Sequence, residues 1–454
     1  MTADSIKEIV SRLPGKFIWG TATSAYQVEG AAFSDGKKAS IWDDFVRVPG
    51  AVKNGDTADV GCDQYNRFRE DVGLLSGMGV DAYRFSLAWS RILPDGTGAV
   101  NQKGIDYYKS LLDALREKNI TPYVTLYHWD LPSALQQKGG WTNRSVLGWF
   151  GEYTEAVIKH LGADIPHFIV LNEPSVVACV GHYEGVHAPG LKSAKSMYAA
   201  MHHLNMVHGQ SYRQIKAALP QADVGSTYTH FPIYPVDDAP ESKTAAELML
   251  SIWSYGFMDP LFKGTYPANI ANDMAPHIKQ GDLEICNTPG DFIGMNHYCP
   301  DYAKKADAEV PACLTFAHNA GKIDPIGTTD LGWPIVPQGL YDALMDINTR
   351  YKPSRVIITE GGCAFNDEPG EDGKVHDKRR IDYYAAYLDA ALKAAAHGVP
   401  LEGYFAWSFL DNFEWAEGFG PRFGLVHVDY EDGLKRRPKD SYFWFRELIE
   451  KSRA

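Results

Sequence analysis

The sequence has few cysteines and no long apolar run. Its six cysteines are scattered along 454 residues without a Cys-x-x-Cys motif. They are Cys62, Cys179, Cys286, Cys299, Cys313 and Cys363. We therefore expect reduced, mostly buried thiols rather than a disulfide framework. No stretch approaches the roughly 18 consecutive apolar residues of a membrane-spanning helix, which predicts that the membrane is not a partner.

Positive charge is also scarce. The chain carries 44 Lys and Arg against 57 Asp and Glu, a net charge of −13, and its densest basic stretch is only Lys435-Arg436-Arg437. This balance argues against a nucleic-acid partner, which needs a basic surface. Residues 1–17 lack the apolar core and small-residue cleavage site of a secretory signal, so we expect a cytoplasmic protein.

Metal-ligand and nucleotide motifs are missing as well. The sequence has no His-x-His and no HExxH, and no G-x-G-x-x-G follows an expected strand. His202 and His203 are neighbours within an expected helix and therefore point to different faces. His182 and His187 flank GHYEGVHAPG, which we interpret as a turn-rich loop. The sequence thus predicts no metal and no cofactor.

Short apolar, β-rich segments alternate with stretches of helical periodicity. We expect strands at 17–26, 82–89, 121–129, 167–173, 223–230, 292–298, 355–360 and 403–410. The clearest helical patterns cover 66–78, 103–119, 145–161, 197–219 and 381–398. Eight alternations predict an α/β fold, the (β/α)₈ TIM barrel, with a doubly wound open sheet as the alternative. We expect a single domain over 1–454, with its core at about 14–450.

Polar side chains gather where the expected strands end. The chain reads Asn172-Glu173-Pro174 after the fourth strand and Glu360-Gly361-Gly362 after the seventh. Two long loops, 174–196 and 299–337, also follow strand ends, and in a barrel that rim carries the active site. A single Glu there is most often a salt-bridge partner or helix cap. Two carboxylates flanked by amides and Trp are what glycoside hydrolysis needs, since one acts as acid and the other as nucleophile or base.

Several longer blocks extend this pattern. They are FIWGTATSAYQVEGA, YRFSLAWSRILP, LYHWDLP, LNEP, HYEGVHAPG, IITEGG and WSFLDNFEWAEGFGPRFGLVHVDY. With these blocks in this order, the chain resembles the retaining β-glucosidases of glycoside hydrolase family 1 from about Phe17 to about Arg446. The resemblance implies a small-molecule β-glucoside as partner and hydrolysis of terminal β-D-glucosyl residues through a covalent glycosyl-enzyme.

The resemblance also implies roles for individual residues. Glu173 matches the general acid/base, Glu360 the nucleophile, and Arg84 and Tyr298 the partners that hydrogen-bond the nucleophile. The substrate-binding residues that we assign are Gln27, His128, Trp129, Asn172, Asn296, Trp333, Trp407, Glu414, Trp415 and Phe423. Among these, Trp407 matches the platform beneath the sugar ring.

The chain departs from the family pattern at Gly361, where Asn is more common. We expect Gly361 and Gly362 to be bare so that the sugar can approach the backbone. Glu414-Trp415-Ala416-Glu417 stands where phospho-β-glycosidases carry a Ser/Lys-rich phosphate site, and Glu173 stands where plant thioglucosidases have Gln.

Three alternatives stay open at this point. One is a broader β-glycosidase with β-galactosidase or β-fucosidase activity, and another is a catalytically dead sugar-binding homologue. A third is a barrel enzyme of other chemistry, which would need a Schiff-base Lys or metal-ligand His at a strand end; we find neither. The sequence does not decide whether the chain forms a homo-oligomer.

Overall fold

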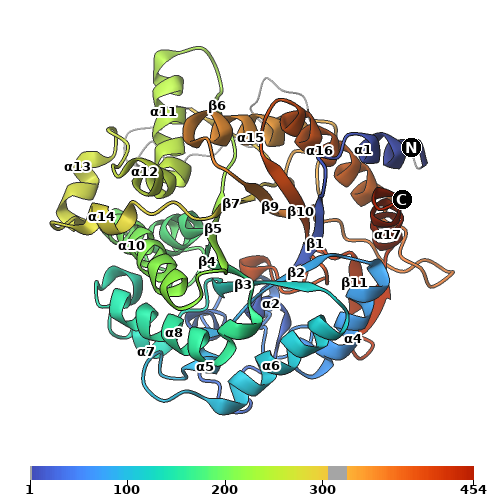
Figure 1. The fold of residues 1–454 in the computed structure, drawn as a ribbon, viewed down its shortest axis with the longest axis horizontal. Coiled ribbons are helices and arrows are strands. Elements are labelled where there is room, and N and C mark those ends of the chain that lie inside the picture. The colour runs from blue at the N-terminus through green and yellow to red at the C-terminus, as the bar shows by residue number, and fades with distance from the viewer. Residues whose placement is uncertain (1–2, 305–324) are drawn as a thin grey trace.

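A closed barrel of parallel strands forms the centre of the molecule in the computed structural model, which describes residues 3–304 and 325–454 (Figure 1). The barrel strands are β1 (Ile18–Ala22), β2 (Ala82–Ser86), β3 (Thr121–Tyr127), β4 (His167–Asn172), β5 (Asp223–Thr229), β7 (Phe292–Asn296), β9 (Val356–Gly361) and β10 (Leu401–Trp407). They are hydrogen-bonded in the order β1-β10-β9-β7-β5-β4-β3-β2. The predicted (β/α)₈ barrel and its eight strands are confirmed. Cys313 and the middle of the expected loop 299–337 lie outside the described residues.

Helices surround this barrel. The main ones are α4 (Gln64–Met78), α6 (Gln102–Glu117), α8 (Val146–Leu161), α10 (Ala194–Ala218), α15 (Pro337–Tyr351), α16 (Lys378–Ala396) and α17 (Asp440–Ser452). The five helical patterns predicted from the sequence correspond to α4, α6, α8, α10 and α16. Near the two chain ends, α1 (Ala3–Ser11) lies beside α17, so both ends of the chain are on the same side of the barrel (Figure 1).

Two regions contain more regular structure than we predicted. The segment after β4, expected to be a loop, begins as α9 (Pro174–Val176) and continues as a π-helix, η4 (Val177–Glu184). The sequence signal for it was the helical spacing of Val176, Val177 and Val180. Between β5 and β7 the chain adds β6 (Ile233–Pro235), α11 (Pro240–Leu250), the π-helix η5 (Ser251–Tyr255), α12 (Gly256–Lys263), α13 (Ala271–Met274) and α14 (Asp282–Cys286).

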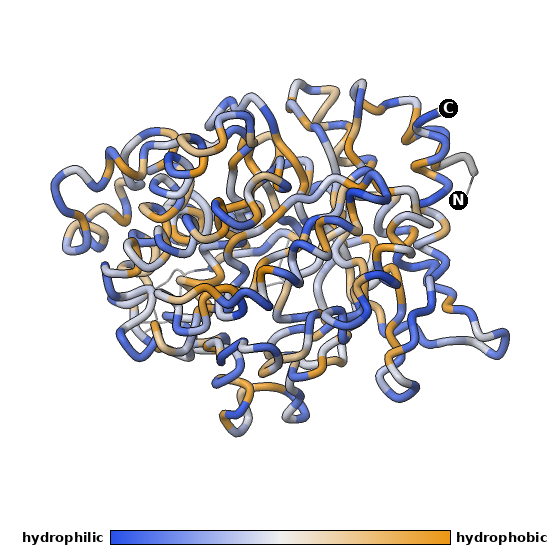
Figure 2. Tube along the Cα trace, turned by 60° about the horizontal axis from the view of Figure 1, so that its bottom comes forward, coloured by the Kyte–Doolittle hydropathy of each residue, from blue (hydrophilic) through white to orange (hydrophobic). Residues whose placement is uncertain are grey.

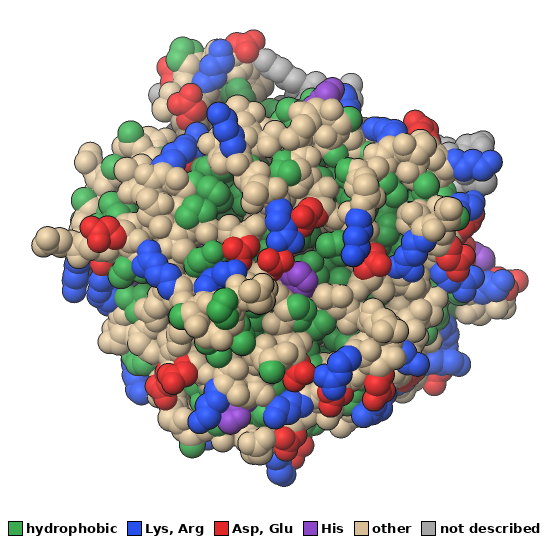
Figure 3. All heavy atoms as spheres, viewed as in Figure 1, with side chains coloured by type: hydrophobic (Ala, Val, Ile, Leu, Met, Phe, Trp, Pro, Cys, Tyr) green, Lys and Arg blue, Asp and Glu red, His purple; other side chains and the backbone are tan. Residues whose placement is uncertain are grey.

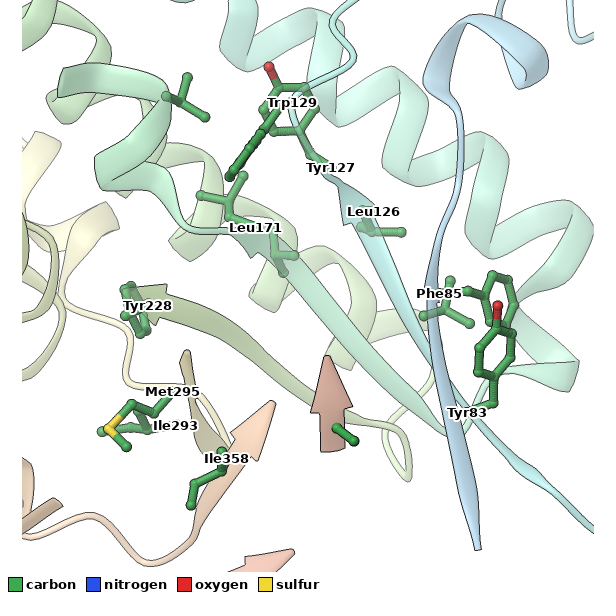
Figure 4. Close-up of a cluster of buried hydrophobic side chains, with 14 of the residues drawn as sticks. Tyr83, Phe85, Leu126, Tyr127, Trp129, Leu171, Tyr228, Ile293, Met295 and Ile358 are labelled. Atoms are coloured by element: carbon green, nitrogen blue, oxygen red, sulfur yellow. The ribbon is translucent and has the colours of Figure 1, made fainter. Parts of the chain in front are cut away.

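Side chains alternate between the barrel interior and the surrounding helix layer. An inner cluster takes residues from six of the strands, namely Ala82, Tyr123, Ile169, Phe292, Ile357 and Phe405, with Ile18 packed against it. The alternate residues, among them Phe85, Met295 and Ile358 in Figure 4, belong to the larger cluster shared with the helices. This period of two is what parallel strands in a barrel require. It confirms that the apolar run before Glu360 is barrel-core strand.

Polar residues lie mainly on the outside. The most hydrophilic stretches are in protruding loops and outer helices, and apolar stretches run mostly through the interior (Figure 2). On the face shown in Figure 3, Lys and Arg side chains are interspersed with Asp and Glu. Within the described parts of the chain, no helix combines the length and apolar character that crossing a membrane requires.

The structure gives Gly361 and Gly362 a different purpose from the one that we expected. A Cβ on Gly361 would lie 2.5 Å from the hydroxyl of Tyr404, and one on Gly362 would lie 1.7 Å from the carbonyl oxygen of Trp407. Tyr404, on β10, belongs to the larger cluster that the strands share with the helices. The glycines therefore let β10 and its side chains pack against β9, and the expectation that they are bare for the sugar is wrong.

This packing makes a testable prediction. We expect Gly361→Ala to lower the free energy of unfolding by about 1–3 kcal/mol, because the new methyl overpacks against Tyr404. Adding Tyr404→Phe should recover part of the loss, since it removes the oxygen at 2.5 Å. Gly148→Ala is the control, because nothing lies within 4 Å of that position in α8. Unfolding midpoints measure the effect, and a Gly361→Ala protein as stable as the wild type would contradict the prediction.

Candidate active site

Glu360 is the penultimate residue of β9, and both oxygens of its buried carboxylate accept hydrogen bonds. Arg84 on β2 donates from Nη1 to Oε1 at 2.5 Å, and the Tyr298 hydroxyl donates to Oε2 at 2.7 Å. Burial raises the pKa of Glu360, while the Arg84 guanidinium and the Tyr298 phenol act in the opposite direction. A nucleophilic carboxyl must be ionised, and the ionised form of Glu360 therefore depends on these two donors. Burial also keeps the pKa of Tyr298 well above its usual value, so the phenol retains the proton that it donates.

Arg84, on β2, connects Glu360 on β9 to β3 and β4. Its Nη2 donates to Asn172 Oδ1 at 2.6 Å on β4, and its Nε donates to Thr125 Oγ1 at 3.2 Å on β3. A further bond runs to the Thr359 carbonyl at 3.1 Å. A planar guanidinium held by this many acceptors has one orientation. The position of Glu360 is thus set by strands far apart in the sequence.

The same network determines the tautomer of His128. Asn172 Oδ1 accepts from Arg84 and from Asn296 Nδ2 at 3.2 Å, so its Nδ2 is the donor toward His128 Nε2 at 3.0 Å. His128 Nε2 must then accept, which places the ring proton on Nδ1. Burial and the Arg84 charge hold the pKa of His128 well below its usual value, so the ring is neutral. Within the described residues, Nδ1 has no hydrogen-bond partner and is left to donate to a ligand.

Glu173 has the opposite electrostatic environment. It follows β4 directly and is 6% exposed. Burial first, and then the negative charge of Glu360, raise its pKa to about 8. Glu173 is therefore mostly protonated at neutral pH, as a general acid must be.

Glu414, in the segment after β10, is a third carboxyl of the site and is half-buried. Burial, followed by the charges of Glu360 and Glu173, raises its pKa to about 8. Its Oε2 is buried and lacks a hydrogen-bond partner in the part of the chain that the structure describes. A largely neutral carboxyl with an unused oxygen is suited to exchange hydrogen bonds with the hydroxyls of a polar ligand.

These groups surround a cavity of about 540 Å³ at the carboxyl ends of the barrel strands. Of the predicted site residues, its wall contains His128, Trp129, Glu173, Tyr298, Trp333, Glu360, Trp407, Glu414, Trp415 and Phe423. The other four, Gln27, Arg84, Asn172 and Asn296, are buried behind the wall and are not among its lining residues. Gln27 bonds to Ser24, Asn412 and the Phe413 carbonyl.

A larger groove of about 790 Å³ lies at the opposite end of the barrel, around residues 119–122, 162–166 and 218–222. Its charged lining residues, Arg116 and Asp164, already pair with each other at 2.8 Å. The smaller cavity contains the carboxyls with raised pKa values, Glu173 and Glu414, and such groups mark functional sites. The chemistry of the lining residues therefore favours the smaller cavity as the candidate active site.

Three residues on the cavity wall have left-handed backbone conformations that are uncommon outside glycine. They are Trp129 with φ 79°, Glu173 with φ 45° and Trp415 with φ 49°. Such strained positions cluster at functional sites and persist only where the surroundings hold them. Trp415 is held by Trp129, with ring centroids 4.5 Å apart, and by Trp42 at 4.7 Å.

Buried ion pairs hold the segment after β10 in place. Lys439 donates to Asp411 at 2.9 Å, with both side chains fully buried. Arg380 on α16 donates to carbonyl oxygens on both sides, to Phe365 at 3.2 Å and to Phe423 at 3.2 Å. Arg380 thereby ties the loop after β9 to the loop that carries Phe423 into the cavity.

Sequence reasoning missed several lining residues. They are Val176, Val180, Glu184, His187, Thr229, Phe231 and Trp253. The first three belong to the helix that we predicted as a loop, where the valine spacing was the available signal. His187 lies in the block HYEGVHAPG, where we considered it only as a metal ligand, and Thr229, Phe231 and Trp253 lie outside the quoted motifs. For the described residues, no group of three or more His, Cys, Asp or Glu is arranged to hold a metal ion.

The opposed environments of the two carboxyls predict a measurable coupling. Glu173 should titrate at about pH 8, and Glu360→Gln should lower its pKa, because the neighbouring negative charge is gone. The value should stay above that of an exposed Glu, since burial remains. Carboxyl ¹³C NMR on glutamate-labelled protein measures it, with Glu173→Gln used to assign the signal. An unchanged pKa in Glu360→Gln would show that the carboxyls are not coupled.

With the site described, comparison with known proteins gives one family match, two similar relatives and one similar solved structure. The model of "Glycosyl hydrolase family 1" matches residues 9–454. A "Beta-glucosidase A" of Thermotoga maritima is 44% identical over 97% of this chain and 98% of its own. A "1,4-beta-D-glucan glucohydrolase" of Thermotoga neapolitana is 44% identical over 97% of this chain and 99% of its own. A solved Thermotoga maritima family 1 β-glucosidase in complex with isofagomine lactam has 43% identity and a TM-score of 0.91, and the match covers 97% of this chain and 99% of that one.

Proposed function

Since the chain belongs to glycosyl hydrolase family 1, we propose that it is a retaining, exo-acting β-glucosidase. Its substrates are cellobiose, short cello-oligosaccharides and aryl or alkyl β-glucosides with a terminal non-reducing β-D-glucosyl residue. The observation that carries this proposal is the pair of carboxyls on one cavity, Glu360 held by cationic and phenolic donors and Glu173 with a pKa raised to about 8. The relatives named above support the same activity.

In the first half-reaction, Glu360 attacks the anomeric carbon and forms a glycosyl ester. The bond from that carbon to the leaving oxygen breaks, and Glu173 gives its proton to this oxygen, so the leaving group departs neutral. The charge of Glu360 is consumed in the ester. Because that charge helps to raise the pKa of Glu173, the pKa falls once the ester has formed.

In the second half-reaction, Glu173 acts as a base. Now deprotonated, it takes a proton from water, whose oxygen attacks the anomeric carbon and displaces Glu360 as the free carboxylate. Two inversions at one carbon retain its configuration. Arg84 and Tyr298 stabilise the departing anion through the same two hydrogen bonds that held it at the start.

The glucosyl ring has both polar and aromatic partners in this scheme. Trp407 offers a ring face, and His128 Nδ1 and Glu414 offer hydrogen bonds to hydroxyls. Asn172, buried behind the cavity wall, donates a hydrogen bond to His128 and so holds the imidazole in position. Trp333 and Phe423, with ring centroids 6.0 Å apart, form an aromatic wall on the side where the leaving group exits.

We further propose that residues 1–454 act as one catalytic domain and that the enzyme is cytoplasmic. One closed barrel takes strands from Ile18 to Trp407, which supports a single domain. Cys62, Cys286, Cys299 and Cys363 are thiols rather than disulfides, in keeping with a reducing compartment.

Removing the nucleophile is the most direct test. We expect Glu360→Gly to lower kcat on 4-nitrophenyl β-glucoside at least about 10⁴-fold, because the covalent route is lost. Azide should restore part of the activity by attacking from the vacated side and giving the α-glucosyl azide. NMR of the product establishes its configuration, and turnover near the wild-type value would show that Glu360 is not the nucleophile.

Removing the acid should leave a different signature. With Glu173→Ala, 2,4-dinitrophenyl β-glucoside needs no proton donor, so ester formation should stay fast and its hydrolysis should become slow. Cellobiose, with a poor leaving group, should lose nearly all turnover. A burst of dinitrophenol followed by slow release measures this. Equal losses on both substrates would contradict the acid role.

The pH dependence follows from the same proton. Because Glu173 must be protonated for the first half-reaction, the basic limb of kcat/KM on cellobiose should have its midpoint at about pH 8, with activity lost as the pH rises above it. The loss should be much weaker on 2,4-dinitrophenyl β-glucoside. Glu414 has a similar pKa, so Glu414→Gln serves as the control, and a basic limb that disappears in this variant would reassign it.

A further inference from the structure

The helix that follows β4 presents a stripe of residues to the cavity. Val176, Val180 and Glu184 are four residues apart, so they lie on one face of the helix formed by α9 and η4. All three line the cavity. The stripe starts beside Glu173, which precedes α9, and its outermost member is Glu184.

This stripe lies on the side of the leaving group. Glu173 protonates the leaving oxygen, so the departing molecule lies next to the start of the helix in the proposed reaction. Val176 and Glu184 are eight residues apart along a helix that is mostly π-helix, so Glu184 lies well beyond Val176 along its axis. Of the carboxyls in the cavity, Glu173 and Glu414 respond to each other or to Glu360, but Glu184 is not among the charges that raise either pKa. Glu184, at the end of the helix furthest from Glu173, therefore faces the outer part of the leaving group in this scheme.

Glu184 has no partner of its own. In residues 3–304 and 325–454, no hydrogen bond or ion pair engages its carboxylate. Its pKa is raised to about 7 by burial, with no charged neighbour contributing. By contrast, the nearby cavity residue Glu417 pairs with Lys53, and Asp330 pairs with Arg379 at 3.0 Å. A half-buried carboxylate in an apolar, aromatic wall gains most from a ligand that supplies a positive charge or hydrogen-bond donors.

We propose that Glu184 is a specificity-determining residue for the leaving group. It selects β-glucosides whose leaving group carries an ammonium or hydroxyl donor at its outer end, and it disfavours those that carry an anion there. The inference rests on the proposed function, because it uses the position of the leaving oxygen beside Glu173. Val176 and Val180 contact the apolar body of the leaving group, and the carboxylate reads its far end.

A matched set of substrates tests this. The glucosides of 4-(2-aminoethyl)phenol, 4-ethylphenol and 4-(2-carboxyethyl)phenol differ at the outer end, while two methylenes insulate the phenol from the charge. At pH 8, above the pKa of Glu184, wild-type kcat/KM should be higher for the ammonium than for the carboxylate substrate by about tenfold. Glu184→Gln should bring this ratio to within about twofold of unity. Because both substrates are compared on one enzyme, changes common to all substrates cancel.

Two further variants make the result specific. Glu155→Gln removes the same charge from an exposed position on α8 outside the cavity and should leave the ratio unchanged. Glu184→Asp keeps the charge and should keep the preference for the ammonium substrate, which also provides a test if Glu184→Gln does not fold. An unchanged ratio in Glu184→Gln would overturn the inference while leaving the β-glucosidase proposal intact. If the wild type hydrolysed none of the three glucosides, the proposed function itself would be overturned.

Discussion

The buried ion pair between Arg84 and Glu360 is the interaction on which the site depends. Removing two charges from water costs several kcal/mol per ion, and the attraction between them offsets this only where further hydrogen bonds are made. Those bonds come from Thr125, Asn172 and Tyr298. The partners reside on or directly after different barrel strands, so the pair is stable only within the closed barrel. The charge of Glu360 therefore depends on the closed geometry of the barrel.

From that pair, the protonation states of the other groups follow. An anionic Glu360 helps to raise the pKa values of Glu173 and Glu414, and Arg84 helps to keep His128 neutral. Three side chains that would have ordinary pKa values in water are changed in this cavity. Glu173 becomes a proton donor, Glu414 a largely neutral carboxyl and His128 a neutral imidazole. The pKa values of Glu173 and Glu414 both respond to the charge of Glu360, which the reaction removes and restores. The chemistry of the cavity therefore changes between the two half-reactions without requiring the fold to change.

Much of the fold could be predicted, because burial leaves a periodic trace in the sequence. The run Val356-Ile357-Ile358 was recognisable as buried strand, and its middle residue packs inside the barrel while its neighbours pack outside. The helix after Glu173 was missed because Gly181 and neighbouring turn residues obscured a short valine pattern. The reason for Gly361 was also missed. The atom that excludes a side chain there belongs to Tyr404, which is 43 residues further on and adjacent only once β9 and β10 have paired.

The sequence by itself determined the barrel, the family and the identity of the two carboxylates, since these rest on local periodicity and on motifs whose residues are neighbours in the chain. Only the tertiary structure decided how those residues are charged, because a pKa depends on burial and on charges brought close by folding. It also decided which residues form the outer cavity, where Glu184 lies on the same helix face as Val176 and Val180. Local patterns specify elements, whereas the environment of a side chain is a property of the packed molecule.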